Sequence, residues 1–393
     1  MSRKYLNIHI LTTIVGANPN RDDTGTPKSL RYGGVERSRM SSQALTRAKR
    51  LGYESDPDGE HSYRSALLGA HISAAAEKIL VDAGTTVDVK MRAQITKQAV
   101  KAVNALVMGE DKAEKKGTEA AAAIERGDAA KAETEVENDS NTDSGDTLVW
   151  LAEAETQAAA VKIAQDFDGA LTPEDFVTAG RTASLSIAAF GRMFAQRPDL
   201  QNEAAIQRAH AFTTHAASVD LDYFTAMDDL RTADRGAGHI GLKQNTGGVY
   251  YWHANIDREQ LDSVWDTTNV ADPARRLTAL ARHLLHDLPK GSQNTSAHHN
   301  LPAFVLITEA DAPVSLQSAF EQPVTPGPDG GHLDGSVKAL MREHQRTTNY
   351  VPALFGASLV TGTHAADAGV TTVDFPVASG AIAAWALGSG LDT

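Results

Sequence analysis

The order of its apolar segments limits the folds that this chain can adopt. Some segments alternate or form short apolar runs, as strands do, and others repeat at three and four residues, as amphipathic helices do. Strands are predicted at residues 5–11, 182–193, 247–256 and 302–307, and helices at residues 43–51 and 273–288. The order strand, helix, strand, strand, helix, strand predicts an α+β fold with a ferredoxin-like sheet, the architecture of RNA-recognition domains.

Two long insertions interrupt this order. Residues 55–180 separate the first helix from the second strand, and apolar repeats over residues 62–108 predict helices there. Within this insertion, residues 110–155 contain fourteen Asp or Glu against five Lys or Arg. That composition predicts that residues 110–147 are a mobile or loosely packed helical insert, and a nucleic-acid mimic is the less favoured alternative. The second insertion, residues 193–246, carries aromatic residues among polar neighbours.

The first fifty residues have the opposite charge. They contain ten Lys or Arg and three Asp or Glu, a balance of +7 in a chain whose net charge is −13. Three glycines and Pro27 predict a loop over residues 20–36. The excess of cations predicts a local positive surface on an acidic protein.

A basic helix is predicted directly after that loop. Ser41 or Ser42 is a natural N-cap for a helix that begins near Gln43, and Arg47 and Arg50 share a face with Gln43. A polyanion could lie along this face, because side-chain donors and backbone N–H groups meet at a helix start. A solvated charged surface is the alternative.

Several motifs in this region resemble those of a known family. The motifs are Asn20-Arg21-Asp22-Asp23, Tyr32-Gly33-Gly34 and Arg39-Met40-Ser41-Ser42-Gln43, followed by the basic helix. They resemble the seventh Cas family, to which CasC, the backbone subunit of the type I-E CRISPR surveillance complex Cascade, belongs. The resemblance spans nearly the whole chain apart from the acidic insert.

The resemblance implies a fold with three parts and a role in antiviral defence. The expected parts are an RRM-like palm at residues 1–54, 181–192 and 247–393, a helical finger region at 55–180 and a thumb at 193–246. It implies a non-catalytic subunit of a ribonucleoprotein. Several copies would line up along one CRISPR guide RNA (crRNA) beside other Cascade subunits and leave its bases free to pair with target DNA. No metal or other cofactor is expected.

The resemblance also implies which residues contact the RNA. Positions that match backbone contacts in the family are Arg21, Lys28, Ser41, Gln43 and Arg50, with Arg47 and Lys49 reinforcing the cationic track. Thr46 stands where relatives often have a lysine on the same helix. Arg192-Met193 matches the place where a methionine of the family contacts the RNA, and Phe224-Thr225 matches the thumb segment that clamps a nucleotide. Each has a simpler alternative: Met193 could fill the core, Phe224 could pack the thumb, and Ser41 could be only a cap. Residues 322–325 replace a lysine-bearing loop, which leaves open whether residues 321–328 contact target DNA.

Competing motifs point to other functions. Residues 236–241 satisfy the dinucleotide-binding pattern GxGxxG, but a polar stretch precedes them, so a flexible loop is expected. Paired carboxylates at Asp22-Asp23 and Asp228-Asp229 could bind magnesium, which makes a metal-dependent endoribonuclease using Asp22 or Asp23 the alternative function. The pairs His283/His286 and His298-His299 are expected to be structural histidines and not metal ligands.

The chain has no cysteine, no apolar signal core and no run that is long enough to span a membrane. A cytoplasmic protein is therefore expected.

Overall fold

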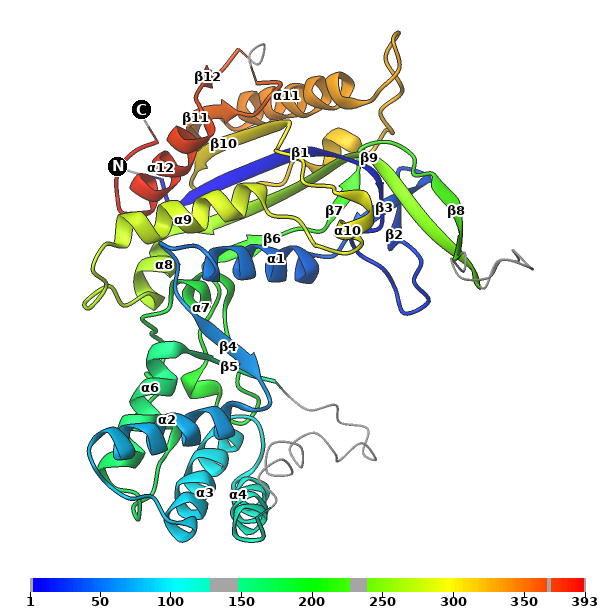
Figure 1. Ribbon diagram of the computed structural model, residues 1–393. Coiled ribbons are helices and arrows are strands. Elements are labelled where there is room, and N and C mark those ends of the chain that lie inside the picture. The colour runs from blue at the N-terminus through cyan, green and yellow to red at the C-terminus, as the bar shows by residue number, and fades with distance from the viewer. Residues whose placement is uncertain (1–2, 128–147, 227–238, 366–368, 392–393) are drawn as a thin grey trace, which may run out of the picture. The chain divides into compact units, whose positions relative to one another are not determined.

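The computed structural model describes residues 3–127, 148–226, 239–365 and 369–391 (Figure 1). The chain forms two compact units. One, the sheet unit, consists of Met1–Tyr53, Ile206–Glu259 and Ala274–Thr393, and the other, the helical unit, of Glu54–Ala205 and Gln260–Pro273.

A ten-stranded sheet forms the centre of the sheet unit. Its order is β12-β11-β10-β1-β9-β7-β3-β2, and β6 and β8 also pair with β9. The strands are β1 (Tyr5–Ala17), β2 (Ser29–Tyr32), β3 (Val35–Met40), β6 (Ile206–Arg208), β7 (Ala211–Thr213), β8 (Val219–Ala226), β9 (His239–Asp257), β10 (Phe304–Ala310), β11 (Phe355–Thr361) and β12 (Thr371–Thr372). The strands predicted around residues 5–11, 247–256 and 302–307 are thus confirmed as parts of β1, β9 and β10.

Helices cover both faces of this sheet. Figure 1 shows α11 on one face and α1 and α9 on the other. The helices of the unit are α1 (Ser42–Glu54), α9 (Pro273–His286), α10 (Gln293–Ser296), α11 (Leu333–Tyr350) and α12 (Phe375–Ala386), with 3-10 turns η3 (Gln317–Phe320) and η4 (Pro352–Leu354). Helix α8 (Arg258–Val264) begins in this unit, but most of its residues belong to the helical unit. The helices predicted near residues 43–51 and 273–288 are confirmed as α1 and α9.

The central strand β1 is buried on both faces, although its alternation predicts a strand with one exposed face. Its polar residues point toward internal partners: His9 Nδ1 lies 2.9 Å from the Tyr251 hydroxyl, and Asn7 Oδ1 accepts a hydrogen bond from Val314 N–H. Burial lowers the pKa of His9 well below its ordinary value. The polar positions of the pattern therefore line a second packed face and not the solvent.

Residues 182–193 do not form the strand that the sequence predicts. They contain helix α7 (Leu185–Phe190) in the helical unit, which is buried along almost its whole length. The Ser184 side chain accepts a hydrogen bond from Ile187 N–H, and Gly191 ends the helix at φ +76°. A short apolar run with a serine cap and a glycine stop fits a buried helix as well as a strand. The short strand β6 pairs with β9 instead.

The helical unit is built from long helices around one apolar core. Leu68, Ile72, Ile95, Val103 and Ile163 are among the residues of this core. The elements are β4 (Ser62–Ser65), α2 (Leu68–Asp82), α3 (Val89–Ala105), α4 (Glu110–Glu125), β5 (Val149–Ala152), α6 (Glu153–Gln165), α7 and the 3-10 turns η1 (Pro173–Asp175) and η2 (Pro198–Leu200). The helices predicted over residues 62–108 are confirmed by α2 and α3.

The described part of the acidic insert is a packed helix. Ala113, Ala120 and Ala123 of α4 are buried, and a Cβ on Gly117 would lie 2.7 Å from the carbonyl oxygen of Lys97 on α3. Glu114 pairs with Lys101 and Lys97, which lowers its pKa to about 2. The helical form of the prediction is therefore confirmed at residues 110–125, but this helix packs closely against α3 and is not loose, while residues 128–147 lie outside the described residues. Among the described helices, none is both long and apolar enough to cross a membrane.

Candidate nucleic-acid interface

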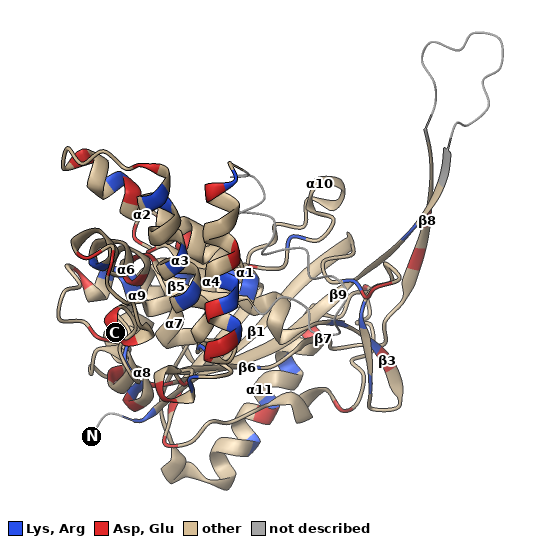
Figure 2. Ribbon diagram, turned by 90° about the horizontal axis from the view of Figure 1, so that it is seen from below, with Lys and Arg blue, Asp and Glu red and all other residues tan. Residues whose placement is uncertain are grey.

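Cations gather on β2, β3, α1 and the segment before β2, and Figure 2 colours them blue. Arg21, Arg31 and Arg47 are exposed, and Lys28 and Arg39 are partly exposed. Within the described ranges, none of these five forms an ion pair with a carboxylate, although other lysines and arginines of the chain do. Their charges are therefore available to an external anion. This surface is called the cationic track below.

The start of α1 is held by side chains from three segments. Ser41 N–H donates to Asn20 Oδ1 at 2.8 Å, Ser42 N–H donates to His210 Nδ1 at 2.8 Å, and Ala44 N–H donates to Ser41 Oγ at 3.2 Å. These three N–H groups are thus occupied, contrary to the expectation that the helix start offers them to phosphate. The N–H of the exposed Gln43 has no acceptor among the described residues.

The residues before β2 form a tight turn organised by Asp22. One oxygen of its carboxylate accepts hydrogen bonds from the Thr24 hydroxyl, Thr24 N–H and Thr26 N–H. The Thr24 hydroxyl is the largest cause that lowers the pKa of Asp22, and the backbone N–H groups add to it. A carboxylate that anchors a turn in this way has a structural task. The turn presents Arg21, whose backbone bridges to Pro27, at the surface.

The expected loop over residues 20–36 is wrong at its second half, which forms the hairpin β2–β3. Gly33 and Gly34, at φ +62° and +80°, make a turn that matches the twist of a hairpin. A Cβ on Gly33 would lie 1.7 Å from the carbonyl oxygen of Glu321, so only glycine fits against this backbone. The glycine pair in the Tyr32-Gly33-Gly34 motif therefore brings the hairpin against the chain just after η3.

Arg37 anchors the β2–β3 hairpin to the interior of the sheet unit. Its side chain is fully buried and donates to the carbonyl oxygens of Tyr32, Thr213 and Phe320 at 2.9–3.2 Å. Burial lowers its pKa, and its guanidinium lies 5.9 Å from the centroid of the Tyr32 ring. Arg37 thus joins β3 to β7 and η3 and does not itself reach solvent.

Lys49 does not reinforce the cationic track, although the sequence predicts that it does. The side chain is fully buried, its Nζ donates to the Asp287 carbonyl at 2.8 Å, and it lies 4.1 Å from the centroid of the Trp252 ring. Burial lowers the pKa of Lys49 to about 7, and the nearby Asp287 partly opposes this effect. Lys49 is therefore a core residue between α1 and α9.

Two further predicted contact residues on α1 use their hydroxyls inside the protein. Ser41 is buried and is the N-cap, which was the alternative left open for it. The Thr46 hydroxyl donates to the Ser42 carbonyl at 2.6 Å, so its single proton is not available to a phosphate in this arrangement. Arg50, on the next turn, is partly exposed.

Replacing Ser41 by alanine is expected to lower the free energy of unfolding by about 1 kcal/mol, because the Ala44 N–H loses its acceptor. Urea denaturation monitored by circular dichroism measures the change. Ser41→Asn retains an acceptor and is the matched control, so it should recover most of the stability. Equal losses in both variants would contradict a capping role for the hydroxyl.

In the helical unit, Arg192 and Met193 have opposite environments. Arg192 is buried and pairs with Glu155 at 2.5 Å, so direct RNA contact by its side chain, as the sequence predicts, is not supported. It also donates to the Trp150 carbonyl at 3.3 Å. The next side chain, Met193, is 79% exposed, so the alternative that it fills the core is wrong.

The hairpin of β8 and β9 carries the predicted clamp, Phe224 and Thr225. Phe224 is 46% exposed and lies opposite Gly241 of β9. A Cβ on Gly241 would lie 2.2 Å from the Phe224 ring, so the ring covers the backbone of this glycine. The expected flexible loop is therefore wrong at residues 239–241, which are part of β9, whereas residues 236–238 and Asp228-Asp229 lie outside the described residues.

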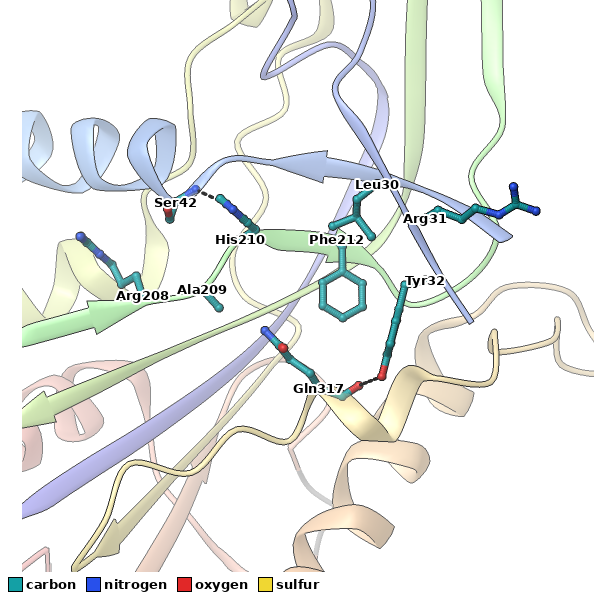
Figure 3. Close-up of a pocket in the computed structure, with 9 residues that line it drawn as sticks. All are labelled: Leu30, Arg31, Tyr32, Ser42, Arg208, Ala209, His210, Phe212 and Gln317. Atoms are coloured by element: carbon teal, nitrogen blue, oxygen red, sulfur yellow. Dashed lines mark hydrogen bonds between the residues drawn. The ribbon is translucent and has the colours of Figure 1, made fainter. Parts of the chain in front are cut away.

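The structure also contributes residues that the sequence did not single out. A cavity of about 390 Å³ adjoins the start of α1, and Ser42, His210, Phe212 and Gln317 are among the residues that line it (Figure 3). Burial lowers the pKa of His210, and the charges of Arg39 and Lys28 lower it further. No spacing in the sequence connects these positions, because they come from three separate segments.

The histidine pairs have internal partners. His283 and His286 both contact the Asp287 carboxylate, at 2.8 and 3.3 Å. Burial opposes the charge of Asp287, but the two histidines and Lys49 keep its pKa below the ordinary value. His298 is buried and bonded to Ser296 and the Pro289 carbonyl. The described residues contain no cluster of three or more His, Asp or Glu with the geometry of a metal site.

Comparisons with known proteins identify a family and a similar fold. The family model described as "CT1975-like protein" matches residues 6–382. A chain from a structure described as "CRISPR RNA-guided surveillance complex, pre-nicking" has a TM-score of 0.71 and 26% identity, over 97% of this chain and 100% of the other. A second, from a "CRISPR RNA-guided surveillance complex", has a TM-score of 0.62 and 22% identity over 97% and 99%. No curated protein has significant sequence similarity to the chain.

Proposed function

Because the chain belongs to the CT1975-like family of CRISPR-associated proteins, we propose that it is a non-catalytic subunit that binds crRNA in a Cascade surveillance complex. The resemblance to the Cascade backbone subunit, expected from the sequence, is confirmed by the family match and the structural likeness. The observation that carries the proposal is the cationic track, whose exposed lysines and arginines have no carboxylate partners among the described residues. Arg21, Lys28, Gln43, Arg47 and Arg50 hold the ribose-phosphate backbone.

The remaining contacts come from residues whose exposure suits them to RNA. In this proposal Met193 contacts the RNA, and Phe224 and Thr225 of the β8–β9 hairpin clamp a nucleotide. Base stacking on an aromatic ring such as Phe224 contributes about 1 to 3 kcal/mol in single-strand binders. Lys49 and Arg192 act only through the packing of the elements that carry the contact residues.

The sheet supports the expected palm. Strands β10, β1, β9 and β6 are neighbours in that order, and all three pairings are antiparallel. Helix α1 follows β1 and α9 lies between β9 and β10 in the chain, which is the arrangement of a ferredoxin-like RNA-recognition fold. We assign the palm to the sheet unit and the finger region to residues 55–180. The thumb expected at residues 193–246 shares β6, β7 and the first part of β9 with the sheet unit, and residues 181–192, expected in the palm, belong to the helical unit.

Contacts made mainly to the ribose-phosphate backbone, without reading of sequence, suit a filament that carries a guide RNA. Copies of the chain associate head to tail, because a heterologous interface extends along the RNA instead of closing into a dimer. Other Cascade subunits complete the complex, and base pairing, not the protein, selects the target DNA. Residues 321–328 contain no lysine that could contact the target DNA. The complex works in the cytoplasm.

RNA affinity is expected to fall steeply as salt increases, because every neutralised phosphate contributes about −0.7 to the slope of log K against log salt on a single strand. Gel shifts with a guide RNA at a series of salt concentrations measure this slope. The same reactions with magnesium should contain no cleaved RNA. Because the Asp22 carboxylate anchors a turn, the alternative function, a metal-dependent endoribonuclease, is not favoured.

Asp23→Ala separates the two functions. Asp23 is exposed in the same turn as Asp22. RNA binding by this variant should equal that of the wild type. Magnesium-dependent cleavage that Asp23→Ala abolishes would support the nuclease, and affinity that does not change with salt would contradict contact with the phosphate backbone.

A further inference from the structure

The cavity beside the start of α1 has the size of a small ligand site. Its volume of about 390 Å³ falls in the range of pockets that bind small molecules. Its lining comes from β2, the end of β6, β7, the first turn of α1 and η3. The lining residues are Leu30, Arg31, Tyr32, Ser42, Arg208, Ala209, His210, Phe212 and Gln317.

Aromatic rings form its apolar walls. Phe212 and Tyr32 meet edge to face, with ring centroids 5.6 Å apart and an angle of 79°. The Tyr32 hydroxyl lies 3.3 Å from the Gln317 carbonyl, to which it donates, and this bond fixes the position of its ring. In Figure 3 the Phe212 ring lies between Leu30 and Gln317. A flat ligand could stack on such a wall.

The neutral side chains of His210 and Gln317 also line the cavity, together with the cations Arg31 and Arg208. His210 Nδ1 accepts from Ser42 N–H, so in the neutral ring Nε2 carries the proton and is a donor. Burial, followed by the charges of Arg39 and Lys28, lowers the pKa of His210 and favours this neutral form. The Gln317 carboxamide adds both a donor and an acceptor, and no carboxylate lines the cavity. The Arg31 guanidinium points away from the cavity in Figure 3.

We propose that this cavity receives one unstacked nucleobase of the bound RNA. A base is planar, uncharged and has both acceptors and donors on its edge, which are the properties that Phe212, His210 and Gln317 can recognise. The phosphate attached to that base would lie near Lys28 and Arg39, whose charges already act on His210. The inference rests on the proposed function and adds, beside the cationic track, a base contact separate from the one proposed for Phe224.

Two variants alter the cavity without changing the cationic track. Ala209→Phe fills it, and Gln317→Ala removes the carboxamide while leaving the main chain that Tyr32 contacts. Ser318→Ala is the matched control, because Ser318 lies on the same 3-10 turn, does not line the cavity and donates to Glu343. Circular dichroism of each variant checks that the fold is retained. If the Ala209→Phe variant does not fold, the smaller Gln317→Ala change still tests the proposal.

Binding is measured for a uridine oligonucleotide, for an abasic ribose-phosphate oligomer of equal length and for free UMP. Ala209→Phe should lower affinity for the uridine oligonucleotide about five- to a hundredfold, which is the range for loss of one stacked base. Gln317→Ala should lower it about two- to tenfold, which is the range for loss of one hydrogen bond. The salt slopes of both variants and their affinity for the abasic oligomer should equal those of the wild type. Ser318→Ala should bind every probe as the wild type does.

The outcomes separate this inference from the proposed function. Wild-type binding that is equal for the uridine and abasic oligomers, or cavity variants that bind the uridine oligomer normally, would overturn the base site while leaving the phosphate contacts intact. Free UMP that binds only to proteins with the open cavity, without any effect of the variants on the oligomer, would assign the cavity to a mononucleotide and also overturn the inference. Failure of the wild type to bind either oligomer would overturn the proposed function itself.

Discussion

The triple variant Arg21→Ala, Arg47→Ala, Arg50→Ala is expected to lose its RNA while its fold stays intact. Each arginine is proposed to donate a charge-assisted hydrogen bond to phosphate, worth about 1.5 kcal/mol or more. Three such losses lower affinity about a thousandfold, and the salt slope becomes less steep by about 2, since each phosphate contributes about 0.7. The ratio of absorbance at 260 to 280 nm of the purified protein, and gel shifts at several salt concentrations, measure both effects.

A second triple variant controls for the change in net charge. Lys338, Arg342 and Arg346 are exposed on α11, in the same unit but outside the cationic track. Their replacement by alanine removes the same number of charges and should change RNA affinity only slightly. Similar losses from both triple variants would mean that RNA responds to overall charge, and full RNA content in the first variant would contradict the proposed interface.

Sequence periodicity predicted the elements that have one clear pattern. The amphipathic repeat of α9 and the alternation of β1 gave the right structures, because helices and strands place apolar residues at different intervals. Residues 185–190 gave the wrong one, since a short run that is apolar throughout has no period that distinguishes a buried helix from a strand. The loop prediction for residues 20–36 rested on glycine and proline content alone. The Gly33-Gly34 pair between Leu30 and Val35 is typical of a hairpin turn and indicated the observed hairpin.

The candidate site was predicted in part for the same reason. Spacing on α1 places Gln43 and Arg47 on one face, and both are exposed. It also places Lys49 four residues after Leu45 and four before Tyr53, both of which are buried, so the helix period already indicated the apolar face. What the sequence could not give is the set of partners from distant segments, such as the Asp287 carbonyl for Lys49 and the Thr213 carbonyl for Arg37.

The burial of Lys49 predicts a pH dependence of stability that Lys49→Met removes. The pKa of Lys49 falls from 10.5 to about 7 on folding, chiefly because burial disfavours its charge. Between these values the unfolded chain binds more protons than the folded one, so stability rises with pH above about 7. The wild type should gain about 2 kcal/mol relative to Lys49→Met between pH 7 and pH 9. Urea denaturation of both proteins at several pH values measures the difference.

Comparison of the two proteins at each pH isolates this residue, because the other titrating groups are common to both. Methionine fills a similar volume beside Trp252 but leaves the Asp287 carbonyl without its donor, so a constant loss of stability is expected at every pH. Only the part that varies with pH reports the proton on Lys49. Arg47→Met, an exposed cation two residues away, should show the wild-type dependence. If the free energies of unfolding of the wild type and Lys49→Met change with pH in parallel, Lys49 stays charged in the folded protein. Asp287 and Trp252 would then stabilise its ammonium group to the same extent as water does.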